Sequence, residues 1–415
     1  MGHTYRFTQP LPTTITTYWG NVERVPPISS IFKSFRIWQH VAFLVAQASI
    51  FYTTEIMKIA FLIQDITTKG GTERTTCCLA NEFAKHNHTV SIVSVFKNEL
   101  AIKYFLNSNV EIIYLTHKEY NLKMGLGKRL GLIIKQHSLV KQCQTLLTAD
   151  VIIGQKILAS LLLWRGGLSN KSVACEHFKF EMYNKFTRTM RNLLYTQFRQ
   201  VVVLTENDEK KFTRILKNVS VIPNMISVNA TKSAGADSKR MISVGRLHPQ
   251  KGYDLLLQAL PRVFDQAPDW TLDIFGEGED YEKLIELCRH LKLTQYVHFK
   301  GYTSNIEQEY AHAALYIMSS RFEGFPMVLL EAAACQLPIV SFQCPEGPET
   351  ILANGGGLLV PPENSIELGK TILKVIKEDQ LRAQLRNETI KITETYSPTI
   401  IYEKWMNLFR RIQIY

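Results

Sequence analysis

The chain of 415 residues lacks several features that would assign it to a class at once. Its seven cysteines are scattered and never spaced as CxxC, so neither a disulfide framework nor a zinc site is indicated, and a reducing, cytosolic compartment is the simplest interpretation. A membrane-spanning helix needs about 18 apolar residues, and no run reaches that length. No short repeat or sustained heptad is present, which excludes collagen-like and coiled-coil folds.

The chain does have the composition of a folded protein, together with an excess of positive charge. Hydrophobic residues make up 46% and charged residues 20%, which excludes intrinsic disorder as the main state. Lys and Arg number 48 against 37 Asp and Glu, so the formal net charge is +11. Such an excess favours nucleic acid, an anionic lipid surface or a phosphorylated small molecule as the partner.

The first 56 residues differ from the rest of the chain. They contain the turn segments PLPTT and VPPISS without a regular hydrophobic period, whereas Met57 opens an apolar strand, MKIAFLI. We expect Met57 to be the natural start, with residues 1–56 either an upstream mis-assignment or an extension that lies on a membrane. A genuine, partly ordered tail is the alternative.

From Met57 onward, short apolar runs alternate with amphipathic stretches. In the first half this pattern predicts a helix over Glu73–His86 and strands over Lys58–Gln64, Val90–Phe96, Val110–Leu115, Ala149–Gly154, Ser172–Cys175, Gln200–Leu204 and Val219–Pro223. In the second half it predicts strands over Met241–Gly245, Thr271–Phe275, Val297–Phe299, Ala314–Ser319 and Pro338–Phe342, with helices over Asp254–Gln266, Asp280–Leu291, Ile306–Ala313 and Met327–Ala334.

Strands that alternate with helices predict parallel βαβ units. The expected fold class is therefore α/β, with two doubly wound, Rossmann-like domains that face a cleft. The polar, aperiodic segment Asn224–Lys239 indicates the connection between them. We place the first domain at residues 57–225, the linker at 226–239, the second domain at 240–397 and a C-terminal helix at 398–415.

The segment GRLHPQKG closes one predicted strand and opens a helix. Arg246 and Lys251 lie five residues apart around this turn, so a guanidinium and an ammonium can converge on one anion. Two solvated surface cations are the alternative, but open α/β sheets bind ligands beyond the carboxyl ends of their strands. Gly276, in the GEG turn after the next strand, lies on the same predicted edge, although such a turn is a weak signal alone.

The run SSRFEGFPMVLLEA is the most informative. Pro326 is suited to the first turn of a helix, because its missing N–H would be unpaired there. The free N–H groups around Phe325–Val328, which follow Gly324, then form an anion site suited to a phosphate. Glu323 falls just before the helix, where it can accept sugar hydroxyls or act as a cap-like acid favoured by the helix dipole.

Glu331 stands in the second turn of the same helix, among leucines and alanines. An acid in such apolar company needs a partner, and a carboxylate there can bind the two hydroxyls of a ribose.

Two segments of the first half could reach the same cleft. Gly70 and Gly71 join the first strand to its helix and let a ligand approach the backbone closely. They lack the P-loop Lys-Ser/Thr and the full GxGxxG, so they are a weak nucleotide signal. His177 follows the strand Ser172–Cys175 and faces the predicted cleft, although a lone histidine is more often structural.

Taken in order, these segments resemble the retaining glycosyltransferases of the GT-B fold, glycosyltransferase family 4. The matching elements are GRLHPQKGYD, IFGEGED, FKGYTS, EGFPMVLLEA with its Glu-x7-Glu pair, SFQCPEGPETI and GGGLLVPPEN. GGTER, EHF and VVVLTEND match more loosely, and residues 1–56 match nothing in the pattern.

The resemblance implies transfer of a sugar from a nucleotide diphosphate sugar, with retention at the anomeric carbon. It implies that residues 57–225 bind the acceptor, that residues 240–397 bind the nucleotide sugar, and that the C-terminal helix returns to the first domain. It implies no cofactor beyond the nucleotide sugar and no essential metal, since two cations and helix N–H groups can stabilise a departing diphosphate.

The resemblance also assigns roles residue by residue. Arg246 and Lys251 would hold the diphosphate, Glu331 the ribose, and Tyr302 would neighbour the base. Glu323 and His177 would contact the donor sugar at the reaction centre, from opposite domains. Gly276, Gly324, Phe325, Pro326 and Val328 would complete the donor site, and Gly70 and Gly71 would lie near the phosphate and acceptor.

We therefore predict a retaining hexosyltransferase that moves a sugar, most simply from a UDP-sugar, to a glycan or lipid-linked acceptor in cell-surface polysaccharide, lipopolysaccharide or glycolipid biosynthesis. A same-face reaction, in which the departing phosphate oxygen helps to deprotonate the acceptor, is preferred to double displacement through Glu323. The alternatives are another GT-B enzyme, such as a sugar-nucleotide epimerase or phosphorylase, and a basic membrane-surface binding protein without catalysis.

Two stretches of the first half carry much of the excess charge. Lys118–Lys141 has basic residues among apolar ones, and Phe178–Arg199 interleaves basic residues with Phe and Tyr. Such stretches fit an anionic membrane surface, with ordinary solvated helix surface as the alternative. No nucleic-acid module is recognisable, so we expect a protein at the cytoplasmic, inner face of a membrane that does not bind nucleic acid.

Overall fold

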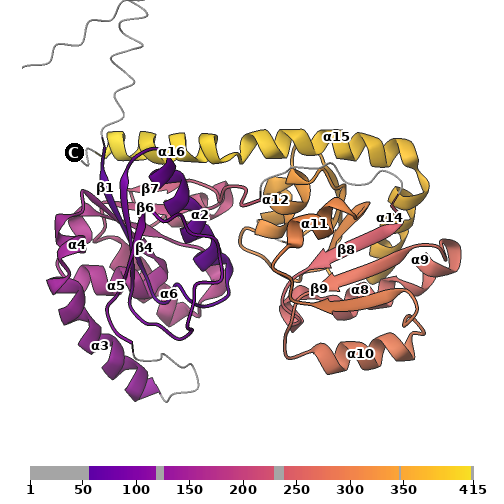
Figure 1. Cartoon of the computed structure of the whole chain (residues 1–415), viewed down its shortest axis with the longest axis horizontal. Coiled ribbons are helices and arrows are strands. Elements are labelled where there is room, and N and C mark those ends of the chain that lie inside the picture. Colours follow the sequence, from indigo (N-terminus) through magenta and orange to yellow (C-terminus); the bar gives the residue numbers. More distant parts are fainter. Residues whose placement is uncertain (1–55, 118–125, 229–237, 345–346, 413–415) are drawn as a thin grey trace, which may run out of the picture. The chain divides into compact units, whose positions relative to one another are not determined.

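The computed structural model describes residues 56–117, 126–228, 238–344 and 347–412, so the predictions for residues 1–55 and for Lys123 lie outside the described residues. Residues from Ile56 onward form one compact unit. It contains two wholly parallel sheets, with the strand orders β3-β2-β1-β4-β5-β6-β7 and β10-β9-β8-β11-β12-β13 (Figure 1). In both sheets the order reverses beside the first strand, so the predicted pair of doubly wound domains is confirmed.

The first sheet consists of β1 (Lys58–Ile63), β2 (Thr89–Ser94), β3 (Val110–Tyr114), β4 (Val151–Gln155), β5 (Ser172–Cys175), β6 (Gln200–Val203) and β7 (Val219–Val221). Its helices are α2 (Gly71–Lys85), α3 (Leu126–Gln142), α4 (Gln144–Thr148), α5 (Lys156–Arg165), α6 (Lys185–Tyr195) and α7 (Glu206–Phe212). The inner strands β1, β4, β5 and β6 are short and almost wholly buried, as parallel strands covered by helices must be, whereas the edge strands β3 and β7 are partly exposed.

The second sheet consists of β8 (Arg240–Val244), β9 (Thr271–Phe275), β10 (Val297–Gly301), β11 (Leu315–Met318), β12 (Ile339–Phe342) and β13 (Gly357–Val360). Its helices are α8 (Tyr253–Ala259), α9 (Pro261–Gln266), α10 (Tyr281–His290), α11 (Ile306–Ala311), α12 (Met327–Ala334), α13 (Gly347–Ile351), α14 (Ser365–Lys377) and α15 (Asp379–Thr395).

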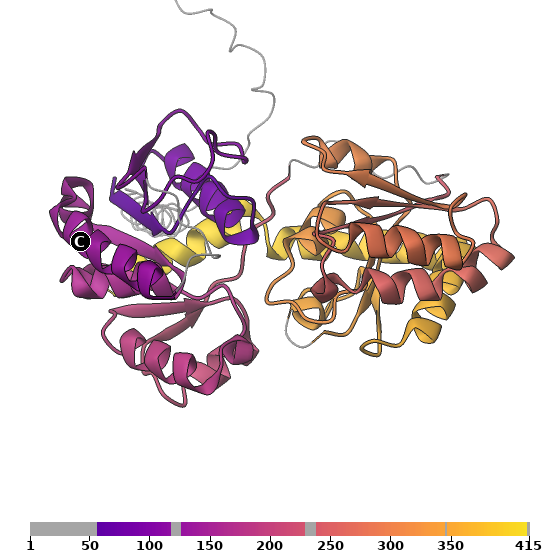
Figure 2. The same ribbon diagram turned by 90° about the horizontal axis from the view of Figure 1, so that it is seen from below.

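The last helix, α16 (Pro398–Arg411), returns to the first domain. Ser397 caps its start, accepting from the Ile400 N–H, and Pro398 occupies its first turn, where no N–H is needed. Its apolar side joins the core around α2, where the Phe409 ring stacks on Phe83 with 5.9 Å between centroids. In Figures 1 and 2, α15 lies along the second domain and α16 along the first, which confirms the predicted return.

The predicted helix Asp254–Gln266 was wrong in one respect. It is two helices, α8 and α9, that meet at Pro261. Proline has no N–H to donate to the preceding turn and clashes with the carbonyl there, so the chain starts a new helix at this residue. The strand β13 and the helix α5 were not predicted, because both are apolar without a clear period.

The connection between the domains is only partly the polar linker that was predicted. Ile226 and Val228 are buried with the core of the second domain, and the Ile226 N–H donates to the Tyr396 carbonyl at 2.9 Å. Residues 229–237 lie outside the described residues. Ile226 and Val228 are therefore packed core, whereas Lys239 at the other end of the segment is exposed.

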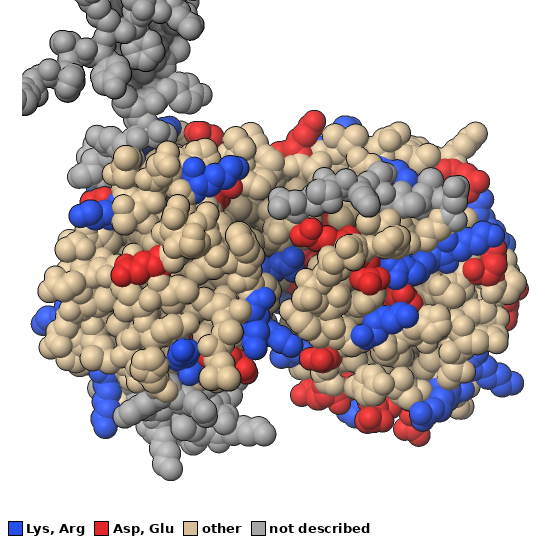
Figure 3. All heavy atoms as spheres, viewed as in Figure 1, with Lys and Arg blue, Asp and Glu red and all other residues tan. Residues whose placement is uncertain are grey.

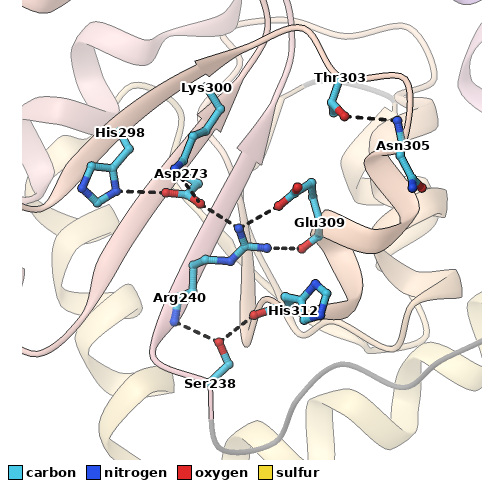
Figure 4. Close-up of polar contacts among 9 residues, drawn as sticks. All are labelled: Ser238, Arg240, Asp273, His298, Lys300, Thr303, Asn305, Glu309 and His312. Carbon is cyan, nitrogen blue, oxygen red and sulfur yellow. Dashed lines mark hydrogen bonds and ion pairs between the residues drawn. The ribbon is translucent and has the colours of Figure 1, made fainter.

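A polar cluster fastens the amino-terminal part of the second sheet (Figure 4). Arg240, the first residue of β8, donates to Asp273 on β9 at 2.7 Å and to Glu309 on α11 at 2.8 Å. Asp273 also lies 3.0 Å from His298 on β10. Because Arg240 lies at the amino end of its strand, opposite the edge where ligands bind in such sheets, this cluster stabilises the fold.

Candidate functional site

The loops that follow β8 and β11 lie side by side at the point where the order of the second sheet reverses. Ligands of open α/β sheets bind at this crevice, outside the carboxyl ends of the strands. The loop after β8 carries Arg246 and Lys251, and the loop after β11 carries Glu323. The fold therefore brings together two of the predicted site segments that the sequence separates by about 70 residues.

Lys251 and Glu323 form the central contact of this site. The Lys251 ammonium lies 2.6 Å from Glu323 Oε1, and the Ser320 hydroxyl donates to the same oxygen at 2.7 Å. The side chains of Lys251 and Glu323 are only 20% and 9% exposed, so the pair is largely shielded from water. A charge-assisted pair of this kind holds both side chains in a fixed orientation at the sheet edge.

Side-chain and backbone contacts hold the two loops together. Arg321 binds Asp254 through two hydrogen bonds of 2.9 and 2.7 Å and also donates to the Pro249 carbonyl at 2.7 Å. Gly252 has a φ of +62°, and a Cβ there would overlap the Ser319 carbonyl. Only glycine permits this close approach, which sets the position of Lys251 against the Glu323 loop.

The GEG turn after β9 joins the same edge. Gly276 has a φ of +143°, and a Cβ there would overlap the Gly245 carbonyl oxygen. The Leu247 N–H donates to the Glu277 carbonyl at 3.0 Å. This packing places Gly276 at the same edge of the sheet as Arg246, as the sequence predicts, and Arg246 itself is exposed there.

The helix after Glu323 differs slightly from its prediction. Pro326 is the N-cap, with φ −73° and ψ 105°, and α12 begins at Met327. Phe325 is buried, and its ring packs edge-on against Tyr396 with 5.5 Å between centroids. Phe325 can therefore serve an anion site only through its backbone N–H, whereas Pro326 has no N–H to donate, and Gly324 and Val328 remain partly exposed beside them.

Glu331 is fully buried and has the partners that its apolar surroundings require. Arg74 of α2 lies 2.7 Å from Glu331 Oε1, the Tyr310 hydroxyl donates to Oε2 at 3.2 Å, and Ser227 lies 3.4 Å away. Burial and the nearby Glu331 carboxylate raise the Tyr310 pKa well above its ordinary value. Arg74 belongs to the first domain, so the carboxylate assigned to the ribose is shared between the two domains.

The ring of Tyr302 also contacts a cationic side chain of the first domain. Its ring is 51% exposed after Gly301, and the Lys69 ammonium lies 4.0 Å from its centroid. Lys69 is also 3.6 Å from Glu277 of the GEG turn. Both contacts are at exposed side chains, so they are weak individually and are screened by salt.

His177 follows β5 on the carboxyl edge of the first sheet. Its Nε2 contacts Gln155 Oε1, and burial together with the nearby Lys156 ammonium lowers the His177 pKa from 6.5 to about 3. A Cβ on Gly324 would lie 3.0 Å from the His177 carbonyl, so the two predicted segments are in van der Waals reach. The neutral imidazole can hydrogen-bond a hydroxyl, but it is not a cation near neutral pH.

The first reversal point carries Gly70 and Gly71. The Gly70 N–H donates to the Tyr104 hydroxyl at 3.0 Å, and a Cβ there would overlap the Glu73 carboxylate. Gly71 opens α2 and has open space around it. Lys156 opens α5 with a φ of +66°, and its Nζ lies 5.0 Å from the Phe178 ring centroid.

Three of these residues were not predicted. Arg74 is the last residue of the quoted GGTER segment and Lys69 directly precedes that segment, but no spacing rule connects either residue to the second domain. Lys156 stands at the end of a buried strand, where its charge was a signal that could have been followed. Residues with positive φ other than glycine cluster at functional sites, and Lys156 is one of them.

Chemically, the described residues offer a shielded Lys–Glu pair, an exposed arginine and the start of α12 at one sheet edge. Cations and free backbone N–H groups so placed can hold a phosphorylated ligand. Within the described ranges, no group of three or more His, Cys, Asp or Glu side chains is arranged to hold a metal ion. No helix among those same residues is both long and apolar enough to cross a membrane.

Comparison with known families gives matches to both halves of the chain. Residues 229–392 match the family described as Glycosyl transferases group 1, and residues 69–230 match the Glycosyltransferase Family 4. The two matches meet at the connection between the sheets.

Individual relatives match along nearly their whole length. An uncharacterized glycosyltransferase of Haemophilus influenzae is 30% identical over 361 residues, covering 85% of this chain and 99% of its own. The amylovoran biosynthesis glycosyltransferase AmsD of Erwinia amylovora is 26% identical with the same coverage. A mutant of S. aureus TarM, solved with fondaparinux, alpha-GlcNAc-glycerol and UDP, has the same fold, with a TM-score of 0.70 and 17% identity over 85% of this chain and 100% of that one.

Proposed function

The chain belongs to the group 1, family 4 glycosyltransferases, and we propose that it transfers a sugar from a nucleotide diphosphate sugar, most simply a UDP-sugar, with retention at the anomeric carbon. The observation that carries the proposal is the Lys251–Glu323 pair, shielded at the reversal point of the second sheet. A donor bound there would place its leaving group beside a cation and its sugar beside a carboxylate.

Lys251, Arg246 and the start of α12 would neutralise the departing diphosphate. Charge develops on the leaving phosphate oxygen as the glycosidic bond breaks, and a preorganised cation in a shielded site stabilises that charge strongly. Glu323 holds Lys251 in place before any ligand binds, so the ammonium needs little reorganisation when the charge develops. This account needs no divalent ion, and we expect turnover to persist in EDTA.

Glu323 would orient the donor sugar. Its Oε1 already accepts from Lys251 and Ser320, so this oxygen is engaged in hydrogen bonds and is a weak nucleophile. We therefore favour the same-face reaction, in which the departing phosphate oxygen helps to take the proton of the acceptor hydroxyl. His177, neutral because its pKa is lowered by burial, would hydrogen-bond a sugar hydroxyl from the first domain.

Glu331 would hold the ribose hydroxyls at the far end of the donor. Arg74, Ser227 and Tyr310 already bind both oxygens of this fully buried carboxylate, so a ribose hydroxyl would have to replace one of these partners. Tyr302, exposed beside Lys69, would flank the base.

The acceptor would be a glycan or a lipid-linked glycan of a surface polysaccharide. The supporting observations come from similar proteins: AmsD acts in amylovoran biosynthesis, and the TarM mutant was solved with alpha-GlcNAc-glycerol and UDP. The acceptor would enter along the edge of the first sheet formed by Gly70, Gly71 and His177.

A donor screen tests the proposal. The purified chain is incubated with UDP-, GDP- and ADP-sugars and lipid-linked acceptors, and released nucleotide and glycosylated product are both measured. We expect equal amounts of nucleotide and product, with the anomeric configuration of the donor retained by NMR. Inversion would overturn the retaining mechanism, and epimerised donor without product would favour a sugar-nucleotide epimerase instead.

A further inference from the structure

The outer side of α6 carries an exposed apolar stripe. Phe186, Met190 and Leu193 are 77%, 50% and 62% exposed. Their spacing of four and three residues places them on one face of the helix. The opposite face, with Leu194 and Tyr195, is buried against the first sheet. Single exposed apolar residues are ordinary, but three aligned on one helix form a contiguous patch that marks an interaction surface.

The apolar stripe lies beside helices that carry no acidic residue. The helices α3, α4, α5 and α6 on one face of the first sheet contain several Lys and Arg and no Asp or Glu, whereas α7, whose Phe212 joins the same core, begins with Glu206, Asp208 and Glu209. Exposed cations of this layer and the turn after α6 are Lys135, Lys141, Arg165, Lys185 and Arg199. Figure 3 shows Lys, Arg, Asp and Glu mixed over the second domain, whereas charges are sparse on the visible side of the first.

The structure corrects the sequence-based view of this region. Arg191 is fully buried, lies 3.5 Å from Glu176 and stacks over Phe212, so it is part of the core. Tyr195 and Phe198 are buried as well. Among the charged and large apolar residues of the predicted basic-aromatic stretch, the exposed ones are therefore the apolar stripe, Met182, Lys185 and the acid Glu181, with Arg199 just beyond the helix end.

We propose that the outer face of the helix layer α3–α6 docks on an anionic membrane surface, with Phe186, Met190 and Leu193 inserted at the headgroup boundary. An interfacial helix has large side chains on one face and basic residues around it, and anionic lipids attract each cation near the surface. A second copy of the chain fits less well, because a symmetric contact would press two basic faces together. This docking does not depend on the identity of the donor or acceptor.

The test is vesicle co-sedimentation with the full chain at low and moderate salt. Vesicles of phosphatidylglycerol and phosphatidylcholine are compared with phosphatidylcholine alone. The stripe variant is Phe186→Gln/Met190→Gln/Leu193→Gln, which keeps helix formers at exposed positions. The matched control is Ile366→Gln/Ile390→Gln, which removes side chains that are 67% and 44% exposed on α14 and α15 of the other domain.

We expect the wild type and the control to bind anionic vesicles and to be released by salt, since exposed charges are screened within about 8 Å at 0.15 M. The stripe variant should bind anionic vesicles at least about tenfold more weakly, and its release of nucleotide in a reaction with a soluble acceptor should be unchanged. Equal binding by the stripe variant, or equal binding to neutral vesicles, would overturn the proposal. A change in oligomeric state by light scattering, without a change in vesicle binding, would instead make this face a contact between copies.

Discussion

Replacing Arg74 with alanine should destabilise the protein through Glu331. The guanidinium lies 2.7 Å from Glu331 Oε1, and the Glu331 side chain is fully buried while that of Arg74 is 23% exposed. Removing one partner of a buried pair leaves an uncompensated charge and typically costs about 3–5 kcal/mol. The Tyr310 hydroxyl still donates to Glu331, and Arg74 is partly solvated, so we expect a loss at the lower end, about 3 kcal/mol.

The size of the effect can be separated from the loss of side-chain packing by a double-mutant cycle. Glu331→Gln removes the charge that Arg74 neutralises, so the double variant should recover much of the stability lost in Arg74→Ala. We expect a coupling free energy of about 2 kcal/mol, within the range for residues in direct contact. Urea unfolding followed by tryptophan fluorescence gives the four stabilities from the midpoints at a common slope.

Arg214→Ala is the matched control, because Arg214 is an exposed arginine of the same domain. It should change stability by no more than about 0.5 kcal/mol. If Arg74→Ala unfolds at the same urea concentration as this control, the buried pair contributes nothing. Strict additivity in the double variant would likewise refute the link between Arg74 and Glu331.

Three further predictions concern the site. Lys251→Ala and Arg246→Ala should lower kcat far more than stability, Lys251→Ala by about 10²–10³-fold, as for loss of one preorganised charge-stabilising group; near-normal transfer by both would reject the diphosphate assignment. Gly276→Ala should lower the melting temperature and weaken nucleotide binding, because its φ is +143° and the new Cβ would overlap a neighbouring carbonyl; Gly71→Ala, with open space around it, is the control and should be nearly neutral. The pKa of His177 is lowered to about 3, so below about pH 6.5 the unfolded chain binds a proton that the folded chain does not, and the free energy of unfolding falls from there toward pH 3. His177→Gln should flatten this part of the profile of stability against pH. An unchanged slope would contradict the low pKa.

The fold was largely predictable because short apolar strands alternate with amphipathic helices. The strands β1, β9 and β12 follow their predicted segments within one or two residues. The exceptions have local causes. Pro261 divides a helix that periodicity alone makes continuous, and α5 is apolar on most sides, so its pattern has no preferred face.

The candidate site was predictable only within each domain. The turn with Lys251 and the loop with Glu323 both follow strands, and parallel strands place such loops at one edge. The partner of Glu331 was predicted to exist, because a buried acid must be compensated, but its identity as Arg74 was not. Hydrophobic period and turn chemistry describe neighbours along the chain, so they carry no information on which residues meet from separate domains.

The surface that we propose to dock on a membrane illustrates the same limit. Composition placed the excess charge in the first domain, but burial decides which cations are available. Arg191 is paired with Glu176 inside the core, whereas Lys185 and Arg199 remain at the surface. The apolar stripe of α6 emerges only when the buried face of that helix is known.

The most direct test of the central claim is calorimetric titration of UDP into the wild type, Lys251→Ala and the Arg214→Ala control. The claim is that the carboxyl edge of the second sheet, with Lys251 at its centre, holds the diphosphate of the donor. We predict saturable binding of one UDP by the wild type and the control, and at least about tenfold weaker binding by Lys251→Ala, since a charge-assisted hydrogen bond contributes about 1.5–3 kcal/mol. Equal binding by all three proteins, or no binding of any nucleoside diphosphate by the wild type, would contradict it.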